Sequence, residues 1–184
     1  HESMRLILWL ENKMNALIGE GKTDDRFTPN HTSIHIGKID GGIAPNVIAQ
    51  ECSFCWDVRT IPGDTPEGIY EEFKAFCDQR EQEMRKVFPG FKITTEIDHP
   101  AVPGLDTSED QEIVSLIREL SQKDQMSAVS YAAEAGQFAE AGFEAVICGP
   151  GDIAQAHRAN EFVHKEQLTL GVEFMHRLIA KLSE

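Results

Sequence analysis

The first 60 residues change from a helical to a strand-like pattern of apolar positions. A 3.6-residue period predicts an amphipathic helix over 1–20, with apolar positions at Met4, Ile7, Leu8, Met14, Leu17 and Ile18. Alternation then predicts strands over 32–39 and 47–59. In the second strand, one face carries Ile48, Cys52, Phe54, Trp56 and Val58, and the other carries Glu51, Asp57 and Arg59. The glycine turn at 41–42 predicts that the two strands pair antiparallel.

A second helix and a third strand complete this pattern. Thr65 followed by Pro66 is a strong helix start, and Pro89-Gly90 stops the helix after about Phe88. Its expected inward positions are Ile69, Phe73, Phe76, Cys77, Met84 and Val87. Alternation over 91–98 predicts a further strand. Residues 1–98 therefore indicate an α+β arrangement, two helices on an antiparallel sheet, like a split βαβ unit that lacks its first strand.

After Pro100 the pattern becomes an alternation of helices and strands. Ser108 and Gln111 have capping-box spacing and predict a helix to about 122, and a last helix is expected over 165–182. Between them we expect strands over 126–130 and 145–148 and a helix over 132–141. This α/β alternation is typical of part of a three-layer domain with a parallel sheet. We therefore predict an α/β chain with domains at 1–106 and 107–184.

The predicted first helix begins at the first residue, with nothing ahead of it to cap or pack against it. We expect the chain to be a fragment, because the second stretch is also too short to cover a parallel sheet on both faces. The alternative is a genuine short protein whose His1-Glu2-Ser3 is a natural or tag-derived N-terminus.

Composition narrows the classes of partner. The chain has 184 residues, 41% of them hydrophobic, and a net charge of −14, which argues against nucleic acid or an anionic membrane as partner. No apolar run approaches the about 20 residues that span a bilayer, so we expect a cytoplasmic protein. Cys52 and Cys55 form a C-x-x-C, but positions i and i+3 of a strand point to opposite faces, which disfavours a metal or redox pair.

Two stretches carry candidate chemistry. Asn46 and Arg59 would stand at the two ends of the long predicted strand and could hold two ends of a small ligand or reach across a subunit boundary. His157 lies in a loop after a predicted strand, where α/β enzymes place their sites. It could be a metal ligand, a general base, or a solvated or structurally hydrogen-bonded histidine. A catalytic zinc needs about three protein ligands, and one histidine cannot hold it.

Taken together, these stretches resemble a known family. The order is G-G-x-A-P-N-V-I, F-x-W-D-V-R, A-E-A-G at 133–136, G-P-G at 149–151 and A-H-x-x-x-E at 156–161. It is similar to the C-terminal half of the zinc-dependent amidohydrolases and exopeptidases typified by acetylornithine deacetylase. Succinyl-diaminopimelate desuccinylase, aminoacylase and glutamate carboxypeptidase are relatives. The resemblance covers essentially the whole chain.

The resemblance implies a subunit with a catalytic domain that binds two zinc ions and an inserted lid that mediates homodimerisation. Residues 1–106 would be most of the lid, and 107–184 the returning catalytic segment. By the same resemblance, His157 would be a zinc ligand, Asn46 and Arg59 would bind a small N-acylated amino-acid substrate, and Gly149 and Gly151 would line its pocket. Zinc-activated water would attack the amide, with a role in amino-acid biosynthesis, arginine biosynthesis in particular.

The chain also departs from that family. It lacks the H-x-D ligand motif, the bridging aspartate, the paired glutamates that include the general base, and the lid histidine. Ala133 stands where the family often has threonine. We therefore expect this chain alone to be inactive. The alternative is a stand-alone, lid-like dimerisation or binding module without catalysis.

Overall fold

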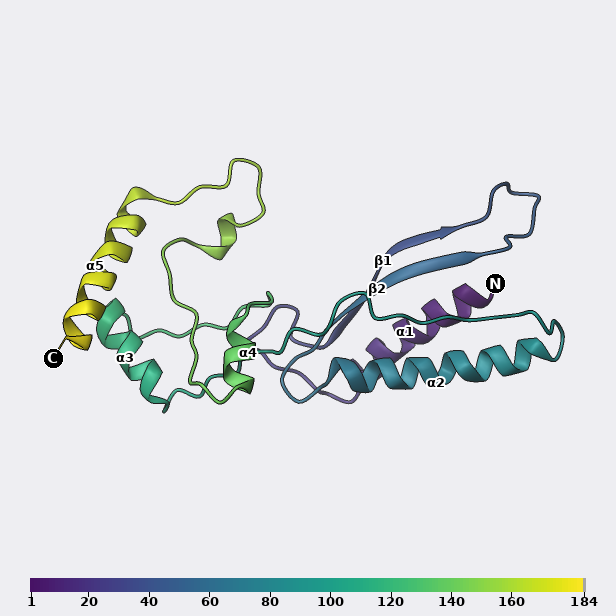
Figure 1. Ribbon diagram of the computed structural model, residues 1–184, viewed down its shortest axis with the longest axis horizontal. Coiled ribbons are helices and arrows are strands. Elements are labelled where there is room, and N and C mark those ends of the chain that lie inside the picture. Colours follow the sequence, from purple (N-terminus) through teal and green to yellow (C-terminus); the bar gives the residue numbers. More distant parts are fainter. Residues whose placement is uncertain (184) are drawn as a thin grey trace. The chain divides into compact units, whose positions relative to one another are not determined.

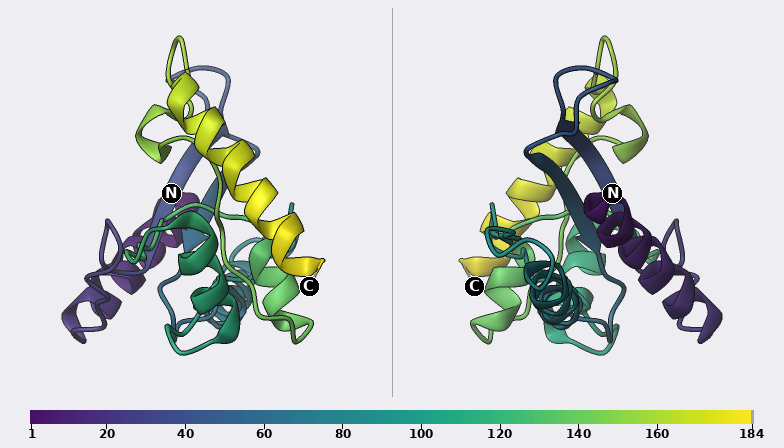
Figure 2. Two further views of the ribbon diagram at one scale, coloured as in Figure 1. Left: turned by 90° about the vertical axis from the view of Figure 1, so that its left-hand side faces the viewer. Right: turned by 90° about the vertical axis from the view of Figure 1, so that its right-hand side faces the viewer.

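Two helices lie along one side of an antiparallel hairpin in the first of the two units into which the chain divides (Figure 1, Figure 2). The computed structural model describes residues 1–183. The first unit comprises 1–104 and 128–132, and the second comprises 105–127 and the residues from 133 on. The elements of the first unit are α1 (Glu2–Gly19), β1 (Ser33–Gly41), β2 (Cys52–Arg59) and α2 (Pro66–Arg85). The predicted mixed α/β class, with helices on an antiparallel pair, is confirmed.

The hairpin register places His35 opposite Asp57 and Ile36 opposite Trp56, with a bulge between Ile36 and Lys38. Ile34, Phe54, Trp56 and Val58 turn inward toward the helices. At the far end of the hairpin, Gly41 faces Cys52 so closely that a Cβ on Gly41 would lie 2.9 Å from the Cys52 Cβ. A glycine is therefore required for the strands to meet there.

Phe73 of α2 lies at the centre of the core of this unit. Its ring centroid lies 5.6 Å from Trp9, 5.3 Å from Trp56 and 6.4 Å from Phe54. One side chain thus joins both helices and the sheet, and aromatic rings at these separations attract one another beyond simple area burial. The buried residues of this hydrophobic core are Leu6, Leu10, Leu17, Ile34, Ile69, Phe73 and Cys77.

Ion pairs at the rim of this core hold α1 against α2. Lys13 on α1 meets Glu72 on α2 at 2.7 Å, and Arg80 on α2 meets Glu2 on α1 at 2.8 Å. Within the core, burial and the negative charge of Asp78 raise the pKa of the Cys77 thiol to about 11.

The buried face of α1 differs from the predicted one. Leu6 and Leu10 are buried together with Leu17, whereas Met4 is 64% and Leu8 is 53% exposed. Apolar residues occur nearly all round this helix, so its sequence contains two possible stripes. The contacts with α2 and the hairpin select the stripe that includes Leu10.

The second helix begins as predicted, because Thr65 accepts a hydrogen bond from the Gly68 amide at 3.3 Å and Pro66 occupies the first turn. Its end was predicted too far along the chain. The helix stops at Arg85, and Val87 is 79% exposed beyond it.

The second strand is shorter than predicted, since it begins at Cys52 rather than at 47. Residues 42–51 form an exposed loop, in which Ile43 is 90% and Ile48 is 96% exposed. The alternation of the sequence continues into this loop, but β1 ends at Gly41 and supplies no ladder partner for it.

The predicted strand over 91–98 was wrong. Phe91, Ile93 and Thr95 alternate inward as in a strand, and Ile93 packs against the core. Within residues 1–183, however, no neighbouring strand pairs with this segment. Side chains of α2 contact it instead: the Ile93 amide donates to a Glu81 carboxylate oxygen at 2.6 Å, and the Tyr70 and Thr95 hydroxyls lie 3.4 Å apart.

The second unit contains α3 (Glu112–Ser121), α4 (Ala135–Glu140), the short 3-10 helix η1 (Ile153–Gln155) and α5 (Lys165–Leu182). The three α-helices were predicted, and η1 was not. The strands predicted over 126–130 and 145–148 were wrong: in the described part of the chain these segments have no parallel neighbour to pair with. The predicted Ser108 cap is not formed either, because α3 starts after Gln111 without a side-chain cap among the described residues.

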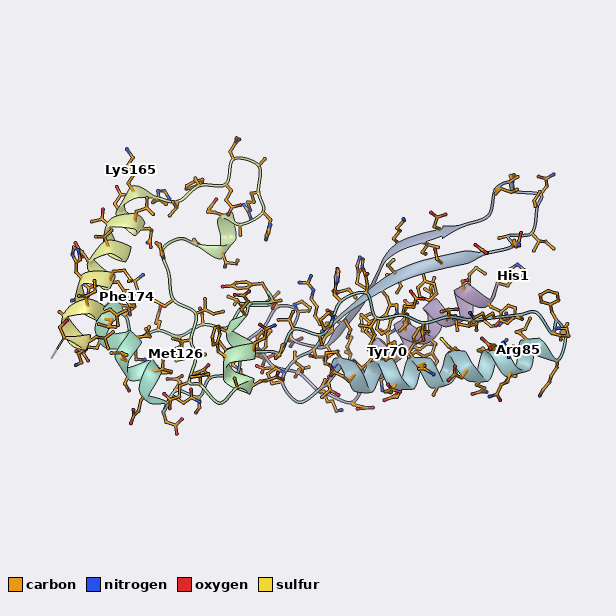
Figure 3. All side chains as sticks on the ribbon, viewed as in Figure 1. His1, Tyr70, Arg85, Met126, Lys165 and Phe174 are labelled. Carbon is orange, nitrogen blue, oxygen red and sulfur yellow. The ribbon has the colours of Figure 1, made fainter. Side chains whose placement is uncertain are left out.

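The second unit is held by α3 and α5, which lie side by side (Figure 1, Figure 3). Arg177 on α5 donates from Nε to the Leu120 carbonyl at 2.6 Å, and Lys181 reaches Glu119 at 2.9 Å. Val114 and Leu120 are the buried side chains of α3. Among the helices that the structure describes, none combines the length and the apolar character that crossing a membrane demands.

Thr32 provides a test of this architecture. Thr32 is 1% exposed, and its hydroxyl donates to Asp64 at 2.5 Å and accepts from the Ile61 amide at 3.2 Å. Thr32→Val keeps the shape but leaves the buried Ile61 amide without an acceptor, so we expect the free energy of unfolding to fall by about 1–3 kcal/mol. Chemical denaturation measures this. Thr23→Val, at an exposed position, is the control; equal stabilities of the two variants would contradict the role of Thr32.

Candidate functional site

Arg59 closes β2 and points away from the core. Strand alternation places Asp57 and Arg59 on the polar face, opposite Trp56 and Val58. The Arg59 Nε donates to Asp57 Oδ2 at 3.1 Å, and its Nη1 donates to the Ser130 carbonyl at 3.4 Å. The Arg59 side chain is still 69% exposed. The guanidinium is therefore held on one side and open to solvent on the other, as binding of an anionic ligand requires.

The segment 128–132 supplies the Ser130 carbonyl, although it is far from Arg59 in sequence. It belongs to the same compact unit as β2. The Ser130 hydroxyl donates to the Thr28 carbonyl at 3.2 Å and ties the segment to the loop after α1. This contact could not be predicted from residue types, because the acceptor on Ser130 is a backbone carbonyl that every residue carries.

Asn46 lies elsewhere in the first unit. It occupies a turn in the exposed loop between β1 and β2, where the Val47 amide donates to the Ala44 carbonyl at 3.2 Å. Asn46 and Arg59 were expected at opposite ends of one strand. That geometry was wrong, because β2 begins six residues after Asn46.

Gly149, Gly151 and His157 lie in the second unit, on the loop between α4 and α5. Gly151 has φ +116°, a backbone conformation that glycine adopts without strain. Asp152 then caps the 3-10 helix by accepting from the Ala154 amide at 2.9 Å. The structure thus brings the glycines and His157 onto one loop, which is exposed at all three positions.

His157 has φ +59° and its amide donates to a Glu161 carboxylate oxygen at 3.1 Å. Within residues 1–183, neither ring nitrogen of His157 makes a hydrogen bond, so the imidazole is available as a ligand or a proton acceptor. No group of three or more His, Cys, Asp or Glu side chains capable of holding a metal ion occurs in that range. A zinc ion needs about three protein ligands, so the described residues do not form a zinc site.

All four cysteines are free, with Cys77 buried and Cys52, Cys55 and Cys148 exposed. Cys55 pairs with Lys38 in the hairpin and Cys52 with Gly41. The C-x-x-C therefore belongs to a strand, where its side chains alternate between faces.

In a comparison with protein families, residues 1–85 match the peptidase dimerisation domain. This range contains α1, the hairpin and α2 almost entirely.

Comparisons with curated proteins extend the similarity over most of the chain. An acetylornithine deacetylase of Myxococcus xanthus is 34% identical over 157 residues, 85% of this chain and 40% of that protein. An N-acetyl-L-citrulline deacetylase of Xanthomonas campestris pv. campestris is 32% identical over 186 residues, 97% of this chain and 46% of that protein. An acetylornithine deacetylase of Photorhabdus laumondii is 28% identical over 89% of this chain. The chain spans less than half the length of these relatives.

Proposed function

We propose that the chain is the lid and a catalytic segment of a hydrolase, because residues 1–85 match the peptidase dimerisation domain. The reaction is removal of an N-acyl group from an amino acid such as N-acetylornithine. The observation that carries this proposal is the similarity to deacetylases over 85% and 97% of the chain, well beyond the dimerisation domain. The proposed division is 1–106 for the lid and 107–184 for the catalytic segment, in a cytoplasmic homodimer.

In this proposal the lid recognises the substrate. Arg59 binds the α-carboxylate, since its planar guanidinium makes parallel hydrogen bonds to a carboxylate. Asn46, an exposed amide at the tip of the hairpin, binds a polar group of the substrate. The backbone at Gly149 and Gly151 lines the pocket. These roles are supported by the exposure of all four residues.

Zinc is the cofactor that the family resemblance implies, and the described residues do not suffice for it. His157 is the one ligand that we assign to this chain. The remaining ligands and the general base would come from a part of the protein beyond these 184 residues. We therefore assign no chemical step to this chain alone and expect it to be inactive.

The test is an assay of the longer protein that carries this chain beside the 184-residue chain alone. Release of acetate from N-acetyl-L-ornithine and N-acetyl-L-citrulline is measured for both. We expect turnover of at least one substrate by the longer protein and none by the short chain. A longer protein that hydrolyses neither, nor any other N-acyl amino acid, would overturn the hydrolase assignment.

A binding module without catalysis is the second candidate. The observation in its favour is that the first unit has its own core, built from both helices and the hairpin. It shares dimerisation with the first proposal but predicts no turnover in any protein that carries the chain, so the same assay separates the two.

Dimerisation is the property that we expect the 184-residue chain to retain. A stable dimer buries about 1,000 Å² or more in total. Light scattering at increasing concentration should give the mass of two 20.5 kDa chains. A mass that stays at that of one chain at high concentration would contradict dimerisation through the lid.

His157→Ala tests the assigned metal ligand. In the longer protein we expect this change to lower the zinc content and the turnover together, because removing one of few ligands opens the coordination shell. Zinc is measured by elemental analysis after dialysis. His99→Ala is the control, at an exposed histidine of the first unit. Unchanged zinc content in His157→Ala would remove this residue from the metal site.

A further inference from the structure

Arg59 makes two contacts that limit how it can bind a ligand. A guanidinium has five N–H donors, one on Nε and two on each terminal nitrogen. The Nε donor is taken by Asp57 Oδ2 at 3.1 Å, and one Nη1 donor points to the Ser130 carbonyl at 3.4 Å. Three donors remain, and all are on Nη1 and Nη2. Within residues 1–183, Nη2 has no hydrogen-bond partner.

A carboxylate can approach a guanidinium side-on, through Nε and one terminal nitrogen, or end-on, through both terminal nitrogens. The side-on approach requires the Nε donor, which Asp57 already occupies. One donor on Nη1 and both donors on Nη2 remain, and these two nitrogens can serve the end-on approach, in which two parallel hydrogen bonds run to the carboxylate.

We propose that Asp57 is a positioning residue, which with the Ser130 carbonyl holds the Arg59 guanidinium so that Nη1 and Nη2 receive the substrate carboxylate end-on. The inference rests on the proposed function, because it assumes that Arg59 binds that carboxylate. Asp57 is suited to this role by its place in the fold. It lies two residues before Arg59 on the same face of a rigid strand, and its position is fixed by pairing with His35.

The negative charge of Asp57, taken alone, is expected to weaken substrate binding, whereas the positioning role strengthens it. Its carboxylate is negative and 60% exposed beside the site, so as a bare charge it would repel an anionic substrate. Removing the charge alone should then tighten binding. Removing the hydrogen-bond acceptor should loosen it, because Arg59 becomes free to adopt other rotamers. The two effects differ in sign, and two variants of one residue separate them.

The experiment measures kcat and KM of the longer protein for N-acetyl-L-ornithine with Asp57→Asn and Asp57→Ala. Asparagine keeps an acceptor oxygen for Nε, and alanine does not. We expect Asp57→Ala to raise KM about fivefold to tenfold at unchanged kcat, and Asp57→Asn to leave KM equal or lower. Any other order of the two KM values overturns the positioning role. Asp78→Ala is the matched control, since Asp78 forms an exposed ion pair with Lys74 at 2.8 Å.

A second readout does not depend on activity. In nitrogen-15 NMR spectra of the 184-residue chain, the Arg59 Nε–H signal is assigned by its loss in Arg59→Lys. We expect this signal at a shifted, slowly exchanging position in the wild type and in Asp57→Asn, and at the position of solvent-exposed arginines in Asp57→Ala. An Arg59 Nε–H signal that has the same position in Asp57→Ala as in the wild type overturns the positioning role of Asp57. If Arg59→Lys leaves KM unchanged while the NMR signal behaves as expected, the carboxylate role of Arg59 fails, but Asp57 still positions the Arg59 guanidinium.

Discussion

Phe73→Ala is expected to destabilise the first unit by about 3–5 kcal/mol, the usual cost of deleting a large buried aromatic side chain. Phe73 is 2% exposed and contacts the rings of Trp9, Phe54 and Trp56. The cavity would open where α1, α2 and the hairpin meet, so no single element can move to fill it. A domain of this size is stable by only about 5–15 kcal/mol, so the loss would be a large part of the total.

Denaturant unfolding followed by tryptophan fluorescence measures this change, because Trp9 and Trp56 both contact Phe73. The control is Phe88→Ala, the same substitution at a side chain that is 60% exposed. We expect the control to change stability by less than about 0.5 kcal/mol. Similar losses in both variants would show that Phe73 is not the centre of the core.

Arg59→Lys is expected to raise KM for N-acetyl-L-ornithine about tenfold to hundredfold, with a smaller effect on kcat. Lysine keeps the charge but cannot form two parallel hydrogen bonds, and it cannot be held by Asp57 and Ser130 in the same way. Hydrogen bonds to charged groups contribute about 1.5–3 kcal/mol, and 1.4 kcal/mol corresponds to about a factor of ten.

The carboxamide analogue of the substrate tests the chemical cause. It lacks the negative charge that Arg59 binds, so its KM should be high in the wild type and change little in Arg59→Lys. Arg5→Lys, at an exposed arginine of α1, is the control variant. A KM for the carboxylate substrate that does not change in Arg59→Lys would end the assignment of Arg59 to substrate binding.

The sequence predicted those elements that are stabilised by their own residues. Thr65 and Pro66 define the start of α2, and the apolar period of 165–182 gives α5 with the same bounds in the structure. The antiparallel pair was predicted because a glycine turn joins two alternating segments. Elements that depend on a distant partner were not predictable in this way. The segments 91–98, 126–130 and 145–148 have strand-like sequences, yet no ladder partner occurs within residues 1–183.

In the candidate site, too, the features set by nearby residues were predictable and the contacts with distant segments were not. Arg59 could be placed on the polar face of a strand from alternation alone, and His157 on a loop from the surrounding glycines and proline. The contacts of Arg59 could not be derived, because Ser130 contributes a backbone carbonyl from a segment 71 positions away in sequence. Which of two apolar stripes α1 buries also depends on tertiary contacts.

The buried thiol of Cys77 can report local unfolding of the first unit through its rate of alkylation. The thiolate is the form that attacks alkylating reagents, and a pKa of about 11 keeps the native Cys77 almost entirely protonated at pH 8. Cys52, Cys55 and Cys148 are exposed and should be alkylated at once. Slow alkylation of Cys77 would then measure the rate at which α2 separates from the core. Mass spectrometry could follow this local unfolding without an added probe.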